Sequence, residues 1–179
     1  MLKEFRPALR FLFIFLGLYL GGNILYGIYV EAYKPDPDPV TRLVSFQTAK
    51  TLNVLGYGVE PVRNPNGPTV YLIQDDKKIL NIFEGCNGIN VMIVMIAFLA
   101  AFGGNGKKMR WFLPLSILII HVTNIARIVL LYFVAVGYHH YFYYVHKYVF
   151  TAVIYLIVVL LWIIWVAKIN EKPKTTAPA

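Results

Sequence analysis

Four long apolar stretches alternate with polar segments along the chain of 179 residues. They cover residues 11–30, 88–104, 112–136 and 148–167. A helix needs about 20 apolar residues to cross the core of a bilayer, with a range of roughly 17–25. Because lipid cannot hydrogen-bond to open backbone, isolated spans must be helical. The pattern therefore predicts four transmembrane helices, although the second stretch reaches spanning length only when all of its residues are counted.

The first apolar stretch follows a basic leader formed by Lys3, Arg6 and Arg10, as in a signal peptide. However, the stretch is longer than a typical signal core, and no small-x-small cleavage site follows it. We therefore expect a signal anchor that the protein retains.

The polar segment of residues 31–87 is the only sizeable part between the predicted spans. After a proline-rich exit, residues 40–55 carry apolar side chains at mostly helical spacing, which predicts an amphipathic helix on the membrane or on the helix bundle. Two β-branched or aromatic runs, residues 69–73 and 79–83, are separated by a polar connection and predict a β-hairpin. The second run leads directly into Cys86.

Composition agrees with a membrane protein, because 58% of the residues are hydrophobic and only 15% are charged. The net charge of +8 orients such a chain, and no basic cluster interleaved with aromatic residues indicates nucleic-acid binding. The single cysteine excludes an internal disulfide and a multi-cysteine zinc site. No histidine or carboxylate pair has the spacing of metal ligands, so we expect no metal and no cofactor.

Lysine and arginine placement predicts the orientation, because these residues favour cytoplasmic loops. Both termini and the loop at residues 103–110 carry nine basic residues against two acidic ones, whereas the segments at 31–87 and 138–147 carry seven of each. The sequence therefore predicts an all-α integral membrane protein with cytoplasmic termini. Residues 1–170 form one membrane domain in this interpretation, and residues 171–179 form a disordered tail.

Cys86 lies in the segment Glu84-Gly85-Cys86-Asn87-Gly88, just before the second apolar stretch. A free cysteine is often a small buried packing residue. Here the start of a helix favours the thiolate, and the bare backbone of Gly85 and Gly88 allows a substrate to approach closely. We therefore identify Cys86 as a candidate nucleophile.

Arg127 lies well inside the third apolar stretch. Burying a guanidinium in a membrane helix costs about 2.5–3.5 kcal/mol even on the gentler insertion scales, so such a residue usually has a function. Snorkelling to the outer interface is the alternative. Asn124, Thr123 and His121 lie on the same side of the predicted helix, and this polar stripe is expected to face the interior of the bundle.

Four histidines compete for the role of acid or base. His146 begins the last apolar stretch at about the depth of Cys86 and is preferred on position, with His140 and His139 next, in a tyrosine-rich outer loop. His121 lies deep in the third stretch, where a hydrogen bond to a neighbouring helix explains it equally well. Glu84 either orients the histidine or stays exposed. A thiol, a histidine and a cation are the minimum set for acyl transfer through a thioester.

At these residues the chain resembles the exosortase and archaeosortase family of membrane transpeptidase-like proteins. The resemblance rests on Cys86-x-Gly88 between a hairpin and a helix, on Asn124-x-x-Arg127 in the next helix, and on His146 at the head of the last. The short length indicates the compact exosortase F type. Two positions depart from the family pattern: Asn87, where serine is frequent, and Phe150, where glycine is frequent.

The resemblance implies that Cys86 is the nucleophile, that Arg127 stabilises the tetrahedral oxyanion and that His146 transfers protons, with Glu84, Gly88 and Asn124 in support. It implies membrane-anchored protein substrates with C-terminal sorting signals and a bacterial inner-membrane location in contact with lipid. The charge count predicts that residues 31–87 and 138–147 face outward, which places Cys86 and His146 at the outer edge of the membrane. The rival hypothesis is a non-enzymatic assembly or lipid-binding subunit, in which Cys86 only packs and Arg127 pairs with a lipid headgroup or a partner helix.

Overall fold

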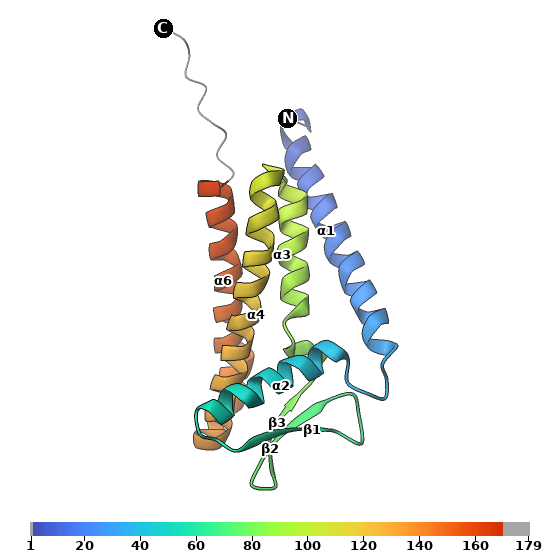
Figure 1. Cartoon of the computed structure of the whole chain (residues 1–179). Coiled ribbons are helices and arrows are strands. Elements are labelled where there is room, and N and C mark those ends of the chain that lie inside the picture. Colours follow the sequence, from blue (N-terminus) through green and yellow to red (C-terminus); the bar gives the residue numbers. More distant parts are fainter. Residues whose placement is uncertain (1, 170–179) are drawn as a thin grey trace.

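The computed structural model describes residues 2–169, so the predicted tail at residues 171–179 lies outside the described residues. Most of the described chain is helical (Figure 1). The apolar stretches form α1 (Leu2–Glu31), α3 (Ile89–Phe102), α4 (Gly106–Gly137), and a last helical segment made of α5 (Phe142–Tyr144), the π-helix η3 (Val145–Val149), α6 (Phe150–Ile164) and the π-helix η4 (Trp165–Ile169). A short 3-10 turn, η2 (His139–Tyr141), precedes this last segment.

Among the described residues, three helical segments are long and apolar enough to cross a membrane, namely Phe5–Glu31, Gly106–Gly137 and Phe142–Ala167. The predicted second span is shorter than expected, because α3 has only 14 residues. At 1.5 Å per residue such a helix covers about 21 Å, which is less than the roughly 30 Å of a bilayer core. Gly103 and Gly104, which both have positive φ angles, follow its last residue and end it.

A three-stranded antiparallel sheet modifies the predicted all-α architecture (Figure 1). Its strands are β1 (Val59–Arg63), β2 (Val70–Gln74) and β3 (Lys77–Ile82), in the order β1-β2-β3. The predicted hairpin is present as β2 and β3, joined by Asp75 and Asp76, which both have positive φ angles as in a type I′ turn. We did not predict β1, because Pro61 lies inside it and proline is tolerated only in edge strands.

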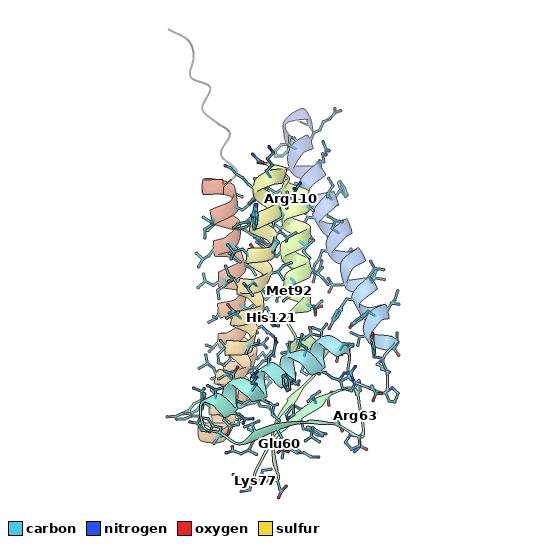
Figure 2. All side chains as sticks on the ribbon, in the orientation of Figure 1. Glu60, Arg63, Lys77, Met92, Arg110 and His121 are labelled. Carbon is cyan, nitrogen blue, oxygen red and sulfur yellow. The ribbon has the colours of Figure 1, made fainter. Side chains whose placement is uncertain are left out.

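The amphipathic helix is present as α2 (Pro39–Val54), close to the predicted range. The Asp38 carboxylate caps its N-terminus by accepting hydrogen bonds from the backbone N–H groups of Val40 and Thr41. Figure 1 shows that α2 and the sheet lie across one end of the helical bundle. Figure 2 shows Glu60, Arg63 and Lys77 at this end of the molecule and Arg110 near the opposite end.

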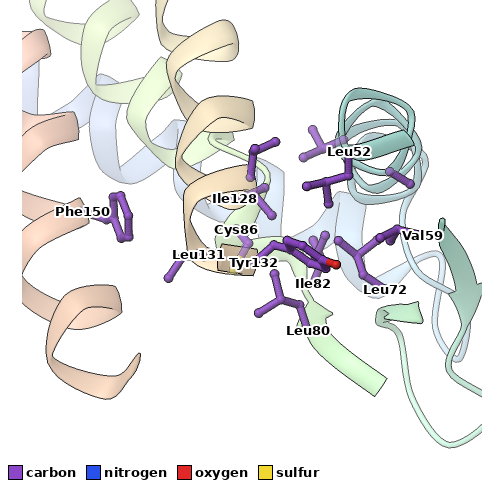
Figure 3. Close-up of a cluster of buried hydrophobic side chains, with 13 residues drawn as sticks. Leu52, Val59, Leu72, Leu80, Ile82, Cys86, Ile128, Leu131, Tyr132 and Phe150 are labelled. Carbon is purple, nitrogen blue, oxygen red and sulfur yellow. The ribbon is translucent and has the colours of Figure 1, made fainter. Parts of the chain in front are cut away.

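Two clusters of buried apolar side chains hold the fold together. The first joins α2, the sheet and α4 and includes Leu52, Leu72 and Ile128 (Figure 3). The second lies inside the bundle, between α3, α4 and the last helical segment, around Met95 and Trp165. The first cluster connects the layer of α2 and sheet to the bundle and so fixes the position of the chain that leads into Cys86.

We predict that Leu52→Ala lowers the thermal stability of the detergent-solubilised protein. Leu52 is fully buried in the first cluster, and truncating such a residue typically costs 2–5 kcal/mol, as a rough range. The matched control is Val54→Ala, two residues further along α2, where the side chain is 81% exposed. Thermal unfolding midpoints measure both variants, and equal midpoints would show that α2 does not contribute to the core.

Candidate active site

The turn that carries Cys86 lies between β3 and α3. The strand ends at Ile82, and the short 3-10 helix η1 (Glu84–Cys86) follows, with the Cys86 N–H donating to the Phe83 carbonyl at 2.8 Å. Gly88 has φ +84°, in the left-handed region, and a Cβ at this position would lie 3.2 Å from Cγ of Asn124. Glycine is therefore required for two reasons, the backbone angle and the close approach of α4.

Asn124 connects α4 to this turn. Its side chain is fully buried, and its Nδ2 donates to the carbonyl of Cys86 at 2.8 Å. Its Oδ1 is buried and has no hydrogen-bond partner among the described residues. The expectation that the polar stripe of this helix faces the protein interior agrees with the burial of Asn124.

Arg127 and His146 are brought together from two different helices. Nη2 of Arg127 lies 3.4 Å from Nε2 of His146, which belongs to the π-helical turn η3. A guanidinium has donors only, so this contact requires an unprotonated Nε2 that accepts the hydrogen bond. The His146 ring also stacks on the ring of Phe142, with centroids 5.8 Å apart.

Cys86 and His146 line the same cavity, which has a volume of about 240 Å³. One wall consists of residues 79–83, and the other consists of Ile128 and Leu131 of α4 together with Phe142 and His146. The three residues predicted as the catalytic set are thus close together: two line the cavity, and Arg127 contacts the second of them.

The pKa of the Cys86 thiol is raised above its ordinary value, chiefly because burial penalises the thiolate. The positive charge of Arg127 and the backbone hydrogen bond to Phe83 act in the opposite direction, and Glu84 adds a smaller increase. The sequence favoured a thiolate at a helix N-terminus. In the structure Cys86 lies three residues before α3 begins, and its side chain is only 7% exposed, so burial outweighs that effect.

Glu84 lies apart from the histidines. Its backbone carbonyl accepts a hydrogen bond from the Tyr26 hydroxyl of α1 at 3.3 Å. With Tyr26 and Lys34 it lines a second cavity, of about 330 Å³, against α1. Among the described residues no hydrogen bond joins Glu84 to a histidine, so the structure does not place it as the group that orients His146.

The other histidines occupy different positions. Nε2 of His121 lies 2.9 Å from Oε1 of Gln47 in α2, a contact between neighbouring helices, and Figure 2 shows His121 at the level of the bundle next to α2. His140 is exposed and packs edge-on against Tyr141. The side chain of His139 lies outside the described residues. Within residues 2–169, no three His, Cys, Asp or Glu side chains form a group that could hold a metal ion.

Sequence reasoning missed the role of Asn87, which appeared only as a departure from the family pattern. Its fully buried amide donates to the Tyr26 hydroxyl at 2.6 Å and to the Thr41 hydroxyl at 3.1 Å, and its Oδ1 accepts from the Ile89 N–H. Asn87 therefore connects the cysteine turn to α1, α2 and the first residue of α3. No spacing rule reveals such contacts, because its partners lie 46 and 61 residues away in the sequence.

These features define an integral membrane protein of several apolar helices, with a thiol, an imidazole and a guanidinium near the end of the bundle that α2 and the sheet cover. A family model described as transmembrane exosortase matches residues 5–165. The chain therefore belongs to the transmembrane exosortase family, and the resemblance noted from its motifs is confirmed. Membership indicates a membrane transpeptidase-like function. No curated protein and no solved structure matches the chain significantly.

We predict that Cys86 reacts with a small alkylating reagent at a half-maximal pH above that of an ordinary cysteine, about 8.5, because burial raises its pKa. In Arg127→Gln the midpoint should move further upward, since the guanidinium charge lowers the pKa. Arg127→Lys, which keeps a positive charge, is the control and should shift less. The pH dependence of the alkylation rate, followed by mass spectrometry, measures this. A downward shift in Arg127→Gln would contradict the electrostatic assignment.

Proposed function

We propose that this protein is a membrane cysteine transpeptidase or protease that cleaves C-terminal sorting signals of exported, membrane-anchored proteins. The observation that carries the proposal is the single cavity lined by Cys86 and His146, with Arg127 in contact with His146. A sorting signal of the expected kind has a short motif, a hydrophobic span and a basic tail. The compact F subtype stays a prediction.

In the proposed reaction the Cys86 sulfur attacks the carbonyl carbon of the scissile peptide bond, and the thiol proton passes to His146. Arg127 moves from His146 to the developing oxyanion, which frees Nε2 for that proton. The contact of 3.4 Å is long for a hydrogen bond, so little is lost when it opens. When the C–N bond breaks, His146 returns the proton to the leaving amine and a thioester remains. Water or an amine acceptor then releases Cys86.

We further propose that the chain crosses the membrane four times. Both termini lie in the cytoplasm, and the active site lies at the outer face of the inner membrane. The charge asymmetry of the loops supports this orientation. The first residues of α1 and the last turns of the final helical segment lie at one end of the bundle, and α2 and the sheet lie at the other (Figure 1). In this proposal α3 is a short fourth span. It packs against α1, α4 and α6, and the turns at its two ends complete the crossing.

We predict that replacing Cys86 with Ser or Ala stops the processing of an exported reporter with a tripartite C-terminal signal, while the variant still accumulates in the membrane. His146→Gln should reduce processing at least about 100-fold, the lower range for loss of a general acid–base group. His140→Gln is the matched control and should process normally, because His140 is exposed and does not line the cavity. Immunoblots of reporter length in cells measure all variants.

Normal processing by the Cys86 variants would favour the rival, a non-enzymatic assembly or lipid-binding subunit. An equal loss in His146→Gln and His140→Gln would instead reopen the choice of histidine.

A separate prediction concerns the topology. Reporters active only outside the cytoplasm should be active when fused after Asp76 and inactive when fused after Lys108. Reporters active only in the cytoplasm should give the opposite result. These two fusion points lie on either side of α3, which with 14 residues is the shortest of the four proposed spans and therefore the one that most needs the test. The same compartment for both fusion points would mean that α3 does not cross.

A further inference from the structure

β3 is an edge strand of the sheet. The order β1-β2-β3 leaves one side of β3 without a neighbouring strand. Among the residues that the structure describes, no backbone hydrogen bond joins this outer side of β3 to another segment. Proteins usually protect such an edge, because its unpaired N–H and C=O groups bind any extended chain.

The cavity of Cys86 and His146 runs along this free edge. Side chains of a strand alternate between its two faces, so a cavity over one face is lined by every second residue. Here five consecutive residues, 79–83, line the cavity, which places it at the edge. Four residues from α4 and the last helical segment form the opposite wall, and Cys86 follows the strand by a short turn.

We propose that the substrate segment beside the scissile bond binds as an added β-strand along the free edge of β3. This inference rests on the proposed function and specifies how its substrate is held. Unpaired backbone groups beside an apolar cavity cost free energy, and the partner whose donors and acceptors match a strand edge is another extended backbone. The occupant is therefore an extended peptide, and the continuous chain from β3 to Cys86 directs its scissile bond toward the thiol.

A bulge limits the length of this binding edge. Leu72 pairs with Leu80 and Ile73 pairs with Lys78, so Ile79 is an extra residue in β3. Bulges of this kind interrupt the regular ladder and occur often at sheet edges and beside active sites. The regular edge of β3 therefore extends over residues 80–82, and Phe83 continues it with an extended backbone (φ −125°, ψ 176°) up to the cysteine turn.

The surroundings of β3 also limit which substrate side chains can bind, because its two faces differ in exposure. Leu80 and Ile82 point into the buried cluster and are 9% and 2% exposed, whereas Asn81 and Phe83 are exposed. An added strand would place alternate side chains against a closed apolar wall and toward an open surface. The cavity of about 240 Å³ is smaller than the roughly 300–1,000 Å³ of typical ligand pockets. The substrate motif is thus expected to alternate small apolar residues with residues that tolerate water.

Disulfide trapping tests the strand pairing. The probe is an exported reporter fused to a tripartite C-terminal signal from the same genome, with single cysteines placed at successive positions around its cleavage site. In a Cys86→Ala background, which keeps the reporter uncut, Asn81→Cys should link to every second reporter position. Phe83→Cys, in the extended residue that follows β3 and exposed like Asn81, should link to positions of the same parity, displaced by two residues. The direction of displacement then gives the strand orientation.

Glu60→Cys in the same background is the matched control, because Glu60 is exposed on β1, the other edge strand of the sheet. Crosslinks at Asn81→Cys several-fold above this control, with a period of two, are the expected result. Crosslinks at consecutive positions, or none above the control, would overturn the strand pairing. If the unmodified protein still cleaved the reporter, the proposed function would stand without it. If the unmodified protein cut no such reporter, both proposals would fail. Use of two trapping positions guards against a variant that does not accumulate.

Discussion

Two buried asparagine side chains, Asn87 and Asn124, hold the turn that carries the cysteine. Asn87 connects it to hydroxyl groups of α1 and α2, and Asn124 donates to the carbonyl of Cys86 from α4. Leaving one such buried group unpaired costs about 1–3 kcal/mol. The positions of the thiol and of the strand that leads to it therefore depend on these amide hydrogen bonds more than on the propensity of the turn itself.

The same burial that fixes the cysteine works against its ionisation. Desolvation raises the pKa of the Cys86 thiol, and the guanidinium of Arg127 is the main opposing charge. In the proposed reaction Arg127 thus affects both the nucleophile and the oxyanion, while its present hydrogen bond is to His146. The raised pKa favours the protonated thiol in the resting protein. Proton transfer to His146 then has to accompany attack, which makes the distance between the two residues critical.

The local features of the chain were predictable, and the long-range contacts were not. Apolar stretches gave the positions of the helices, and the spacing of apolar residues gave α2 almost to its last residue. The strand β1 was missed because Pro61 hides its pattern, and α3 is shorter than its apolar stretch because two glycines end it. Cys86, Arg127 and His146 could be selected from chemistry and order along the chain. The contact between Arg127 and His146 and the role of Asn87 depend on how distant helices pack, which one sequence does not specify.

The parts of the proposed site differ in how they are held. The strand edge, the turn and Cys86 belong to one continuous segment, so their relative geometry depends mainly on local bonds and on the two asparagines. Arg127 and His146 come from α4 and the last helical segment, and the apolar residues near them, Ile128 and Phe150, belong to the first cluster together with α2 and the sheet. Changes in the second cluster, around Met95 or Trp165, should therefore act mainly on the stability of the bundle, because the buried residues next to Arg127 and His146 belong to the first cluster. Changes in the first cluster should affect both parts of the site, because this cluster joins the layer that positions the strand edge to the helices that carry Arg127 and His146.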